Sequence, residues 1–109
     1  MYELWQTEWC PASRRVRQRL TELSIDYVIR QVPVEKGQRH ALLRATGTDT
    51  IPALVFDNGE IATGEDTILR LLSDAAPEPA QAEAHRQKAA KARRRYLEEE
   101  CECSQPATP

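Results

Sequence analysis

The chain has 109 residues, which is the length of one domain and enough to bury a hydrophobic core without disulfide bonds. Its 15 basic residues nearly balance its 17 acidic residues, so net charge favours neither nucleic acid nor an anionic membrane as a partner. No run is apolar enough to span a bilayer, the start shows no signal-peptide pattern, and three cysteines lack disulfide-framework spacing. We therefore expect a cytoplasmic protein in a reducing compartment.

A lone cysteine lies where a short strand gives way to a helix. Tyr2 and Leu4 belong to an alternating apolar and polar run, which predicts a half-buried strand. From about residue 11 to residue 23 the apolar residues recur at helical spacing, at Val16, Leu20 and Leu23. This change of period places Cys10 at or near the N-cap of the helix.

This position favours a thiolate at Cys10. The unpaired N–H groups and the positive end of the helix dipole face the sulfur, and Pro11 suits the first helical position. Arg14 and Arg15 add positive charge, whereas Glu8 opposes it. Cysteines in such settings can have a pKa of roughly 3.5 to 7.5. A buried structural cysteine is the less favoured alternative.

The fourth residue of the motif limits the chemistry. A second thiol at this position could release a partner bound to Cys10, but Ser13 has only a hydroxyl. Another thiol must then resolve the disulfide. It could come from a small molecule, from a partner protein, or from Cys101 or Cys103 if the tail folds back.

The next elements alternate between strand and helix. Arg14, Arg17 and Arg19 are expected on the outer face of the first helix, where a solvated surface is favoured over an anionic partner. A second strand is predicted over residues 25–30, and a second helix around residues 41–45 ends at Gly47. A strand, a crossover helix and a strand imply a parallel pair with a right-handed connection.

The second half of the domain has a hairpin and a third helix. Residues 53–56 form a short apolar run that predicts a core strand, and the turn at residues 57–59 leads to an antiparallel strand over 60–63. Gly64, Glu65 and Asp66 then open a helix that carries Ile68 and Leu72.

The C-terminal part differs in character. Residues 75–79 predict a linker, and residues 80–103 a charged helix with few large apolar groups, for which a solvated arm is favoured over a dimer contact. Residues 104–109 are expected to be disordered. Two tail cysteines without a nearby third or fourth ligand do not predict a metal site.

Several of these motifs together resemble a known family. Residues 10–15, then Thr50, Ile51 and Pro52, and then Gly64, Glu65 and Asp66 are similar to the glutaredoxins and to the N-terminal domain of glutathione S-transferases. The resemblance covers about residues 1–73. It implies an α/β, thioredoxin-like fold of the glutaredoxin type: a four-stranded mixed sheet with helices on both faces, here in residues 1–74, plus the added C-terminal helix.

The resemblance also implies which residues act. Cys10 is the nucleophile, and Ile51 with a cis Pro52 holds the cysteinyl backbone of glutathione; a trans proline is otherwise the commoner case. Glu65 and Asp66 hold the γ-glutamyl end, and Arg39 the glycyl carboxylate.

A departure from the pattern concerns the residue three before the cysteine. Many glutaredoxins have a lysine there, and this chain has Thr7, which weakens the expected hold on glutathione or accommodates another low-molecular-weight thiol.

Three functions follow from the resemblance. The favoured one is a monothiol glutathione-dependent thiol-disulfide oxidoreductase whose partners are a low-molecular-weight thiol and glutathionylated or disulfide-bonded proteins. The second is a transferase resembling the glutathione S-transferases. The third is a binding role without turnover, in which an iron-sulfur cluster is disfavoured because Pro11 and Ala12 differ from the usual cluster-binding motif. A monomer or weak dimer is expected.

Overall fold

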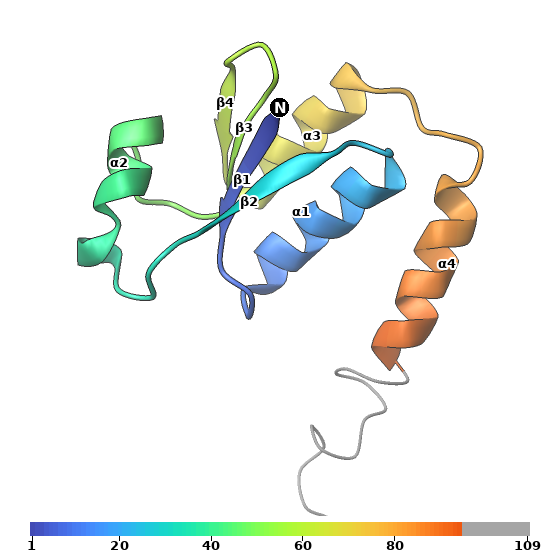
Figure 1. Cartoon of the computed structure of the whole chain (residues 1–109). Helices are drawn as coiled ribbons and strands as arrows, with labels where there is room; N and C mark the ends of the chain where they lie inside the picture. Colours follow the sequence, from blue (N-terminus) through green and yellow to red (C-terminus); the bar gives the residue numbers. More distant parts are fainter. Residues whose placement is uncertain (95–109) are drawn as a thin grey trace, which may run out of the picture.

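The computed structural model describes residues 1–94 and shows a four-stranded sheet with helices on both faces (Figure 1). The strands are β1 (Tyr2–Gln6), β2 (Tyr27–Gln31), β3 (Ala53–Val55) and β4 (Ile61–Thr63), in the spatial order β2-β1-β3-β4. This confirms the predicted α/β, thioredoxin-like mixed sheet.

The sheet combines both strand directions. β1 pairs with β2 in parallel, as expected for a strand, helix and strand in succession, with Leu4 opposite Ile29. β3 runs antiparallel to β1, so the connection from β2 through the second helix does not produce another parallel pair. β3 and β4 form the predicted hairpin, whose turn has Gly59 at a φ of 89°.

The main core lies between the sheet and two helices, α1 (Pro11–Glu22) and α3 (Glu65–Ala75). Leu4 and Leu54 from the sheet meet apolar side chains of both helices, and burial of each such side chain contributes roughly 1.5 to 3 kcal/mol. The buried helical residues are Val16, Leu20, Ile68 and Leu72. The apolar positions that predicted these helices are therefore the ones that hold them to the sheet.

The opposite face of the sheet is covered by α2 (His40–Thr46), which follows a short 3₁₀ helix, η1 (Lys36–Gln38), that the sequence did not indicate. Leu42 is buried there with Val32 and Ala53. α2 ends at Gly47, whose φ of 79° is the left-handed conformation that glycine adopts at low cost.

Arg14, Arg17 and Arg19 on α1 were expected to point into solvent, and this prediction was wrong. All three are half-buried. Arg17 donates a hydrogen bond to the side chain of Gln6, and Arg19 donates to the carboxylates of Glu22 and Glu78, at 3.1 and 2.9 Å. A long cation can lie along the protein surface while its charged end finds a partner.

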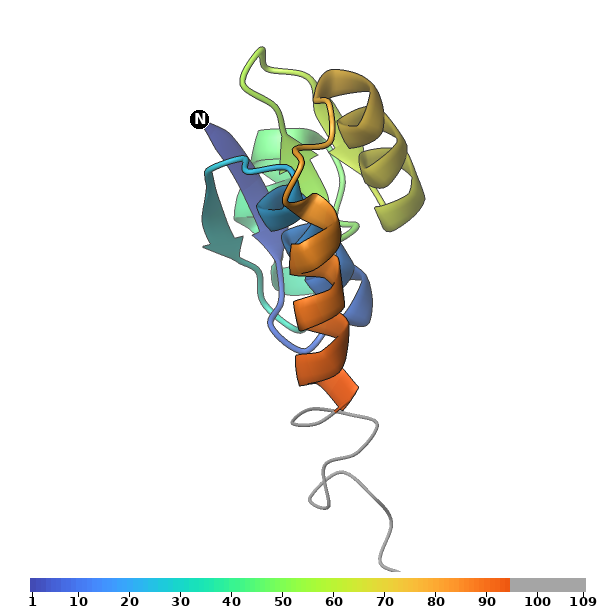
Figure 2. The ribbon, with the colours of Figure 1, turned by 90° about the vertical axis from the view of Figure 1, so that its right-hand side faces the viewer.

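The charged C-terminal helix also differs from expectation. α4 (Ala82–Ala92) is not a solvated arm; it packs along the outer side of α1 (Figures 1 and 2). Ala82 is fully buried, and Arg86 donates to Glu22 at 3.0 Å and to Glu78 at 2.7 Å. Ion pairs thus replace the apolar contacts that its composition lacks.

Glu22 is the centre of this interface. Its carboxylate is 4% exposed and accepts hydrogen bonds from Gln18, Arg19 and Arg86. Burial raises its pKa, but these three donors outweigh burial and hold the pKa below its usual range. An ionised Glu22 therefore links α4 to α1.

Residues 95–109 lie outside the described part of the chain. The predictions for the end of the charged helix, for Cys101 and Cys103, and for a disordered tail at 104–109 fall in this segment. Within residues 1–94, no helix has the length and apolar character needed to cross a membrane.

Candidate functional site

Cys10 is the N-cap of α1, with the extended backbone angles that caps adopt. Its sulfur accepts a hydrogen bond from the backbone N–H of Ser13 at 3.4 Å, and Pro11 is the first helical residue. Cys10 is a free thiol and partly exposed. The predicted position of Cys10 at the N-cap of the helix, with Pro11 as the first helical residue, is therefore confirmed.

The surroundings of Cys10 lower the pKa of its thiol. Burial acts in the opposite direction and raises the pKa, but hydrogen bonds from Ser13 and Ala12 and the charge of Arg15 outweigh it. The Ser13 hydroxyl is buried and has no hydrogen-bond partner among the described residues. The Ser13 side chain is nevertheless one of the groups beside the sulfur that lower the pKa of the thiol.

Arg15 connects Cys10 to the start of α3. Its guanidinium binds the Glu65 carboxylate with two hydrogen bonds, from Nε to Oε2 and from an Nη atom to Oε1, the latter at 2.8 Å. The pKa of Glu65 is lowered by this pair, and Asp66 and Cys10 add to the negative field at Arg15. The N-terminal parts of two helices and the Cys10 sulfur are thereby brought together.

The loop before β3 lies beside this cluster. The peptide bond between Ile51 and Pro52 is cis, and Pro52 is buried. The carbonyl of Pro52 accepts a hydrogen bond from the N–H of Gly64 at 2.8 Å, so this loop is fastened to the residue that caps α3. Gly64 adopts a φ of 86°, which favours glycine at this cap.

Comparison with known families identifies the domain. Residues 4–80 match the family described as "Glutathione S-transferase, N-terminal domain". The chain belongs to this family. Membership of the glutaredoxins in particular stays a prediction, and a comparison with curated proteins finds no match.

Solved structures show the same relationship for this glutathione S-transferase N-terminal domain. A glutathione S-transferase from Rhodospirillum rubrum is 25% identical, with a TM-score of 0.62 over 86% of this chain and 44% of its own. A rice GST in complex with glutathione is also 25% identical, with a TM-score of 0.60 over 84% and 44%. The chain thus spans less than half the length of these two proteins.

A smaller protein has the same fold. A thioredoxin-like protein is 23% identical to this chain, with a TM-score of 0.56 over 67% of this chain and 97% of its own. The likeness shows that the fold is thioredoxin-like.

In this domain the Arg39 side chain binds backbone groups of the protein itself. Its guanidinium donates to the carbonyls of Pro33, Val34 and Asp49, at 2.9 to 3.0 Å. Arg39 therefore joins the segment after β2 to the segment before β3. Three of its five N–H groups are used in these contacts, and a role for Arg39 in binding the glycyl carboxylate stays a prediction.

A polar network around the buried Gln6, at the end of β1, was not anticipated. Gln6 is fully buried; it donates to Glu8 at 3.0 Å and accepts from Arg17. Gln31 also donates to Glu8, at 3.0 Å, and these two amides lower the pKa of that carboxyl. The period of two in β1 places Gln6 on the same face as Leu4, which is the signal that could have indicated its burial.

The described residues contain no metal-binding cluster: within 1–94, no three His, Cys, Asp or Glu side chains are grouped so that they could hold a metal ion.

Proposed function

We propose that this domain is a monothiol, glutathione-dependent thiol-disulfide oxidoreductase that acts through Cys10. The observation that carries the proposal is the position of Cys10 at the N-cap of α1, where the Ser13 N–H contacts the sulfur and the pKa of the thiol is lowered. A thiolate is the form that attacks disulfides, and a lowered pKa also makes it a good leaving group.

The reaction has two exchange steps. The Cys10 thiolate attacks the glutathione sulfur of a mixed disulfide, which forms a Cys10–glutathione disulfide and releases the substrate thiolate to take a proton from water. A second glutathione thiolate then attacks the bound glutathione sulfur. This step yields oxidised glutathione and restores Cys10, so two glutathione molecules supply the two electrons.

Glutathione would bind across the segments that surround Cys10. We assign its cysteinyl backbone to Ile51 and Pro52, and its γ-glutamyl carboxylate to the N–H groups at the start of α3. Because Arg15 already binds the Glu65 carboxylate, the exposed Asp66 is the acid available for the γ-glutamyl amino group. The rice relative in complex with glutathione supports this class of ligand.

The test is reduction of a glutathione mixed disulfide by excess glutathione, coupled to NADPH oxidation through glutathione reductase. The parent should show a robust rate, and Cys10→Ser should lose it. No rate in either protein would reject glutathione as the working thiol.

Transferase activity is the second candidate, favoured by the match of residues 4–80 to the transferase N-terminal domain. Conjugation of glutathione to an electrophile such as 1-chloro-2,4-dinitrobenzene measures it directly. Conjugation above the uncatalysed rate, together with no rate in the mixed-disulfide assay, would favour this candidate over exchange at Cys10.

A further inference from the structure

The outer edge of β2 is open in the described part of the chain. In the strand order β2-β1-β3-β4, β2 has β1 on one side and no described strand on the other. Figure 2, in which β2 is the teal strand at the left, shows no described helix on that side either. Four of its five residues are exposed. Such an edge is a template on which another strand can pair.

Three residues of β2 turn their backbone hydrogen-bonding groups outward. On the β1 side, the N–H of Val32 donates to the carbonyl of Gln6 at 3.0 Å. Backbone groups alternate between the two sides of a strand, so the even-numbered residues of β2 bond to β1. The N–H and C=O groups of Tyr27, Ile29 and Gln31 therefore face away from the sheet, and no strand among residues 1–94 pairs with them.

The features that usually protect an edge strand are missing from β2. Natural edges carry a proline, a bulge or an outward charge. The sequence of β2 is YVIRQ, without proline, and its register with β1 is continuous, without a bulge. Its one charged side chain, Arg30, is turned toward Glu3 of β1, to which it donates at 2.9 Å. Val28 and Ile29 are 38% and 40% exposed, so the edge is apolar.

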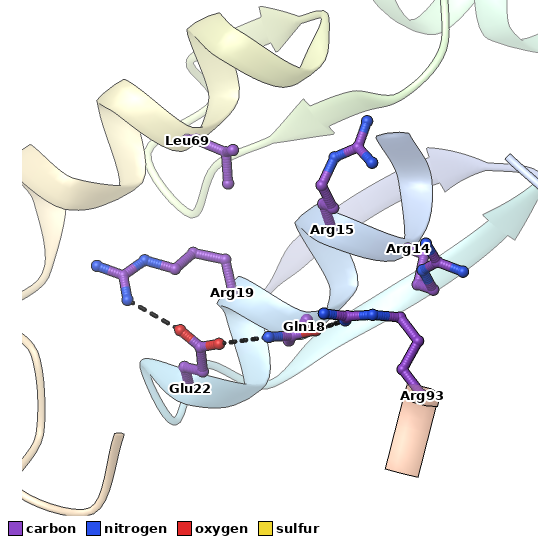
Figure 3. A pocket seen from close by; sticks show the side chains of 7 residues that line it. All are labelled: Arg14, Arg15, Gln18, Arg19, Glu22, Leu69 and Arg93. Atoms are coloured by element: carbon purple, nitrogen blue, oxygen red, sulfur yellow. Dashed lines mark hydrogen bonds and ion pairs between the residues drawn. The ribbon is translucent and has the colours of Figure 1, made fainter. Parts of the chain in front are cut away.

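The helical side of the domain differs, because its polar groups find partners within the chain. Beside the groove between α1, α3 and α4, Gln18 and Arg19 donate to Glu22 at 2.8 and 3.1 Å (Figure 3). Arg93 donates to Gln18 at 3.0 Å. A partner in this groove would compete with these contacts, whereas the outer edge of β2 can accept a strand without losing a contact inside the chain.

We propose that two copies of this chain pair in antiparallel fashion along β2, about a two-fold axis at Ile29, and join their two sheets into one. With Ile29 opposite Ile29 of the second copy, Tyr27 lies opposite Gln31, and these are the hydrogen-bonded pairs of the ladder. The outward N–H and C=O groups of each strand then satisfy those of the other, as a self-complementary interface requires. The inference goes beyond the proposed function and does not depend on exchange at Cys10.

The side chains fit the same register. On one face of the joined sheet, the two Ile29 side chains meet at the axis. On the other face, Arg30 lies opposite Val28 of the second copy, whose neighbour in the sheet is Glu3 of that copy. Arginine and glutamate are thus placed across the axis from each other, so the charges of the two edges are complementary.

The size of the interface sets its strength. Two strands of five residues bury less than about 1,200 Å², which is the lower limit of standard interfaces. We therefore expect a weak dimer that forms at high protein concentration.

The first experiment measures the full-length parent in the presence of a reductant, so that dimers linked by cysteines are not counted. Sedimentation velocity up to about 1 mM protein should show a dimer that increases with concentration. Backbone amide hydrogen exchange should slow with concentration at Tyr27, Ile29 and Gln31. The amides of Val28 and Arg30 already bond to β1 and should be protected equally at every concentration.

Charge variants test the register. Ile29→Lys places two ammonium groups at the axis and should weaken the dimer at least about tenfold. Ile61→Lys is the matched control: it is 41% exposed on β4, the other edge strand, and should dimerise like the parent. Ile29→Glu should be as weak as Ile29→Lys alone, but an equal mixture of the two should pair, because opposite charges then meet at the axis.

Three results would overturn the inference. A monomer at every concentration, with unchanged exchange at Ile29, would mean that the edge does not pair. A dimer that Ile61→Lys disrupts and Ile29→Lys leaves intact would assign the contact to β4. A dimer in which the outward amides of β2 exchange as fast as in the monomer would place the contact elsewhere. These measurements need no glutathione, so failure of the glutathione assay would contradict only the proposed function.

Discussion

Arg15 and Glu65 are 50 positions apart in the chain, yet their side chains form an ion pair with two hydrogen bonds between α1 and the first residue of α3. Arg15 also lowers the pKa of the Cys10 thiol through its charge. One side chain therefore serves both the thiolate and the helix terminus at which we place the γ-glutamyl group. This double contact leads to the first prediction.

Arg15→Gln should raise the pKa of Cys10 and slow its alkylation by iodoacetamide near neutral pH. The positive charge that favours the thiolate is removed, while the backbone N–H of Ser13 remains in place. Because Arg15 is half exposed and screened by solvent, the slowing should be less than about tenfold. The rate measured against pH gives the pKa directly.

Arg30→Gln is the matched control for Arg15→Gln. It breaks an exposed ion pair with Glu3, which joins β1 to β2. Its alkylation profile should coincide with that of the parent. An equal shift in both variants would mean that the effect reports net charge instead of the Arg15 contact.

Ser13→Ala should also raise the pKa of Cys10, but with little loss of stability. The buried Ser13 hydroxyl has no hydrogen-bond partner among the described residues, so its removal leaves no described group newly unsatisfied. The thiolate, in contrast, loses a donor. Alkylation against pH and a thermal melt measure the two effects separately, and Ser73→Ala on the exposed side of α3 serves as the control. A large fall in melting temperature would contradict this account of Ser13.

Glu22→Gln should cost roughly 2 kcal/mol at neutral pH, because three donors, two of them guanidinium groups, lose a carboxylate partner. The pKa of Glu22 is lowered in the folded protein, so the stability from its ionised form is present above its unfolded pKa and is lost as the pH falls through the folded value. Denaturant unfolding from pH 7 down to pH 3 should therefore show a smaller loss for Glu22→Gln than for the parent. Parallel curves would refute the role of the ionised carboxylate.

Arg39→Lys should destabilise the domain by roughly 1 to 3 kcal/mol, because one ammonium group cannot reproduce a planar guanidinium that binds three separate carbonyls. Backbone amide hydrogen exchange near residues 33–34 and 49 should be faster in the variant than in the parent. Arg44→Lys, on the exposed side of α2, is the control and should leave both unchanged. If Arg39 also holds the glycyl carboxylate, the KM for glutathione should rise in the Arg39 variant alone.

Most of the fold was predictable because its signals are local. The change from a period of two to helical spacing around Cys10 located β1, α1 and the cap between them, and Gly47 and Gly59 stand where the chain needs a positive φ. η1 was missed because its three residues carry no periodic pattern. Arg14, Arg17 and Arg19 were wrongly expected in solvent because charged residues on a helix usually indicate a solvated face.

The sequence by itself determined the order of the elements, the position of Cys10 at a helix N-terminus and the absence of a second thiol at Ser13. These depend on neighbours within one or two turns, whose geometry is the same in any fold. Only the tertiary structure decided which partners the charged side chains find. Arg86 and Glu22 are 64 positions apart. Nothing in the sequence around a charged surface residue indicates which distant residue it will pair with. Long-range ion pairs follow from how the helices are placed, and here they attach α4 to α1 and join Arg15 to Glu65 beside the thiol.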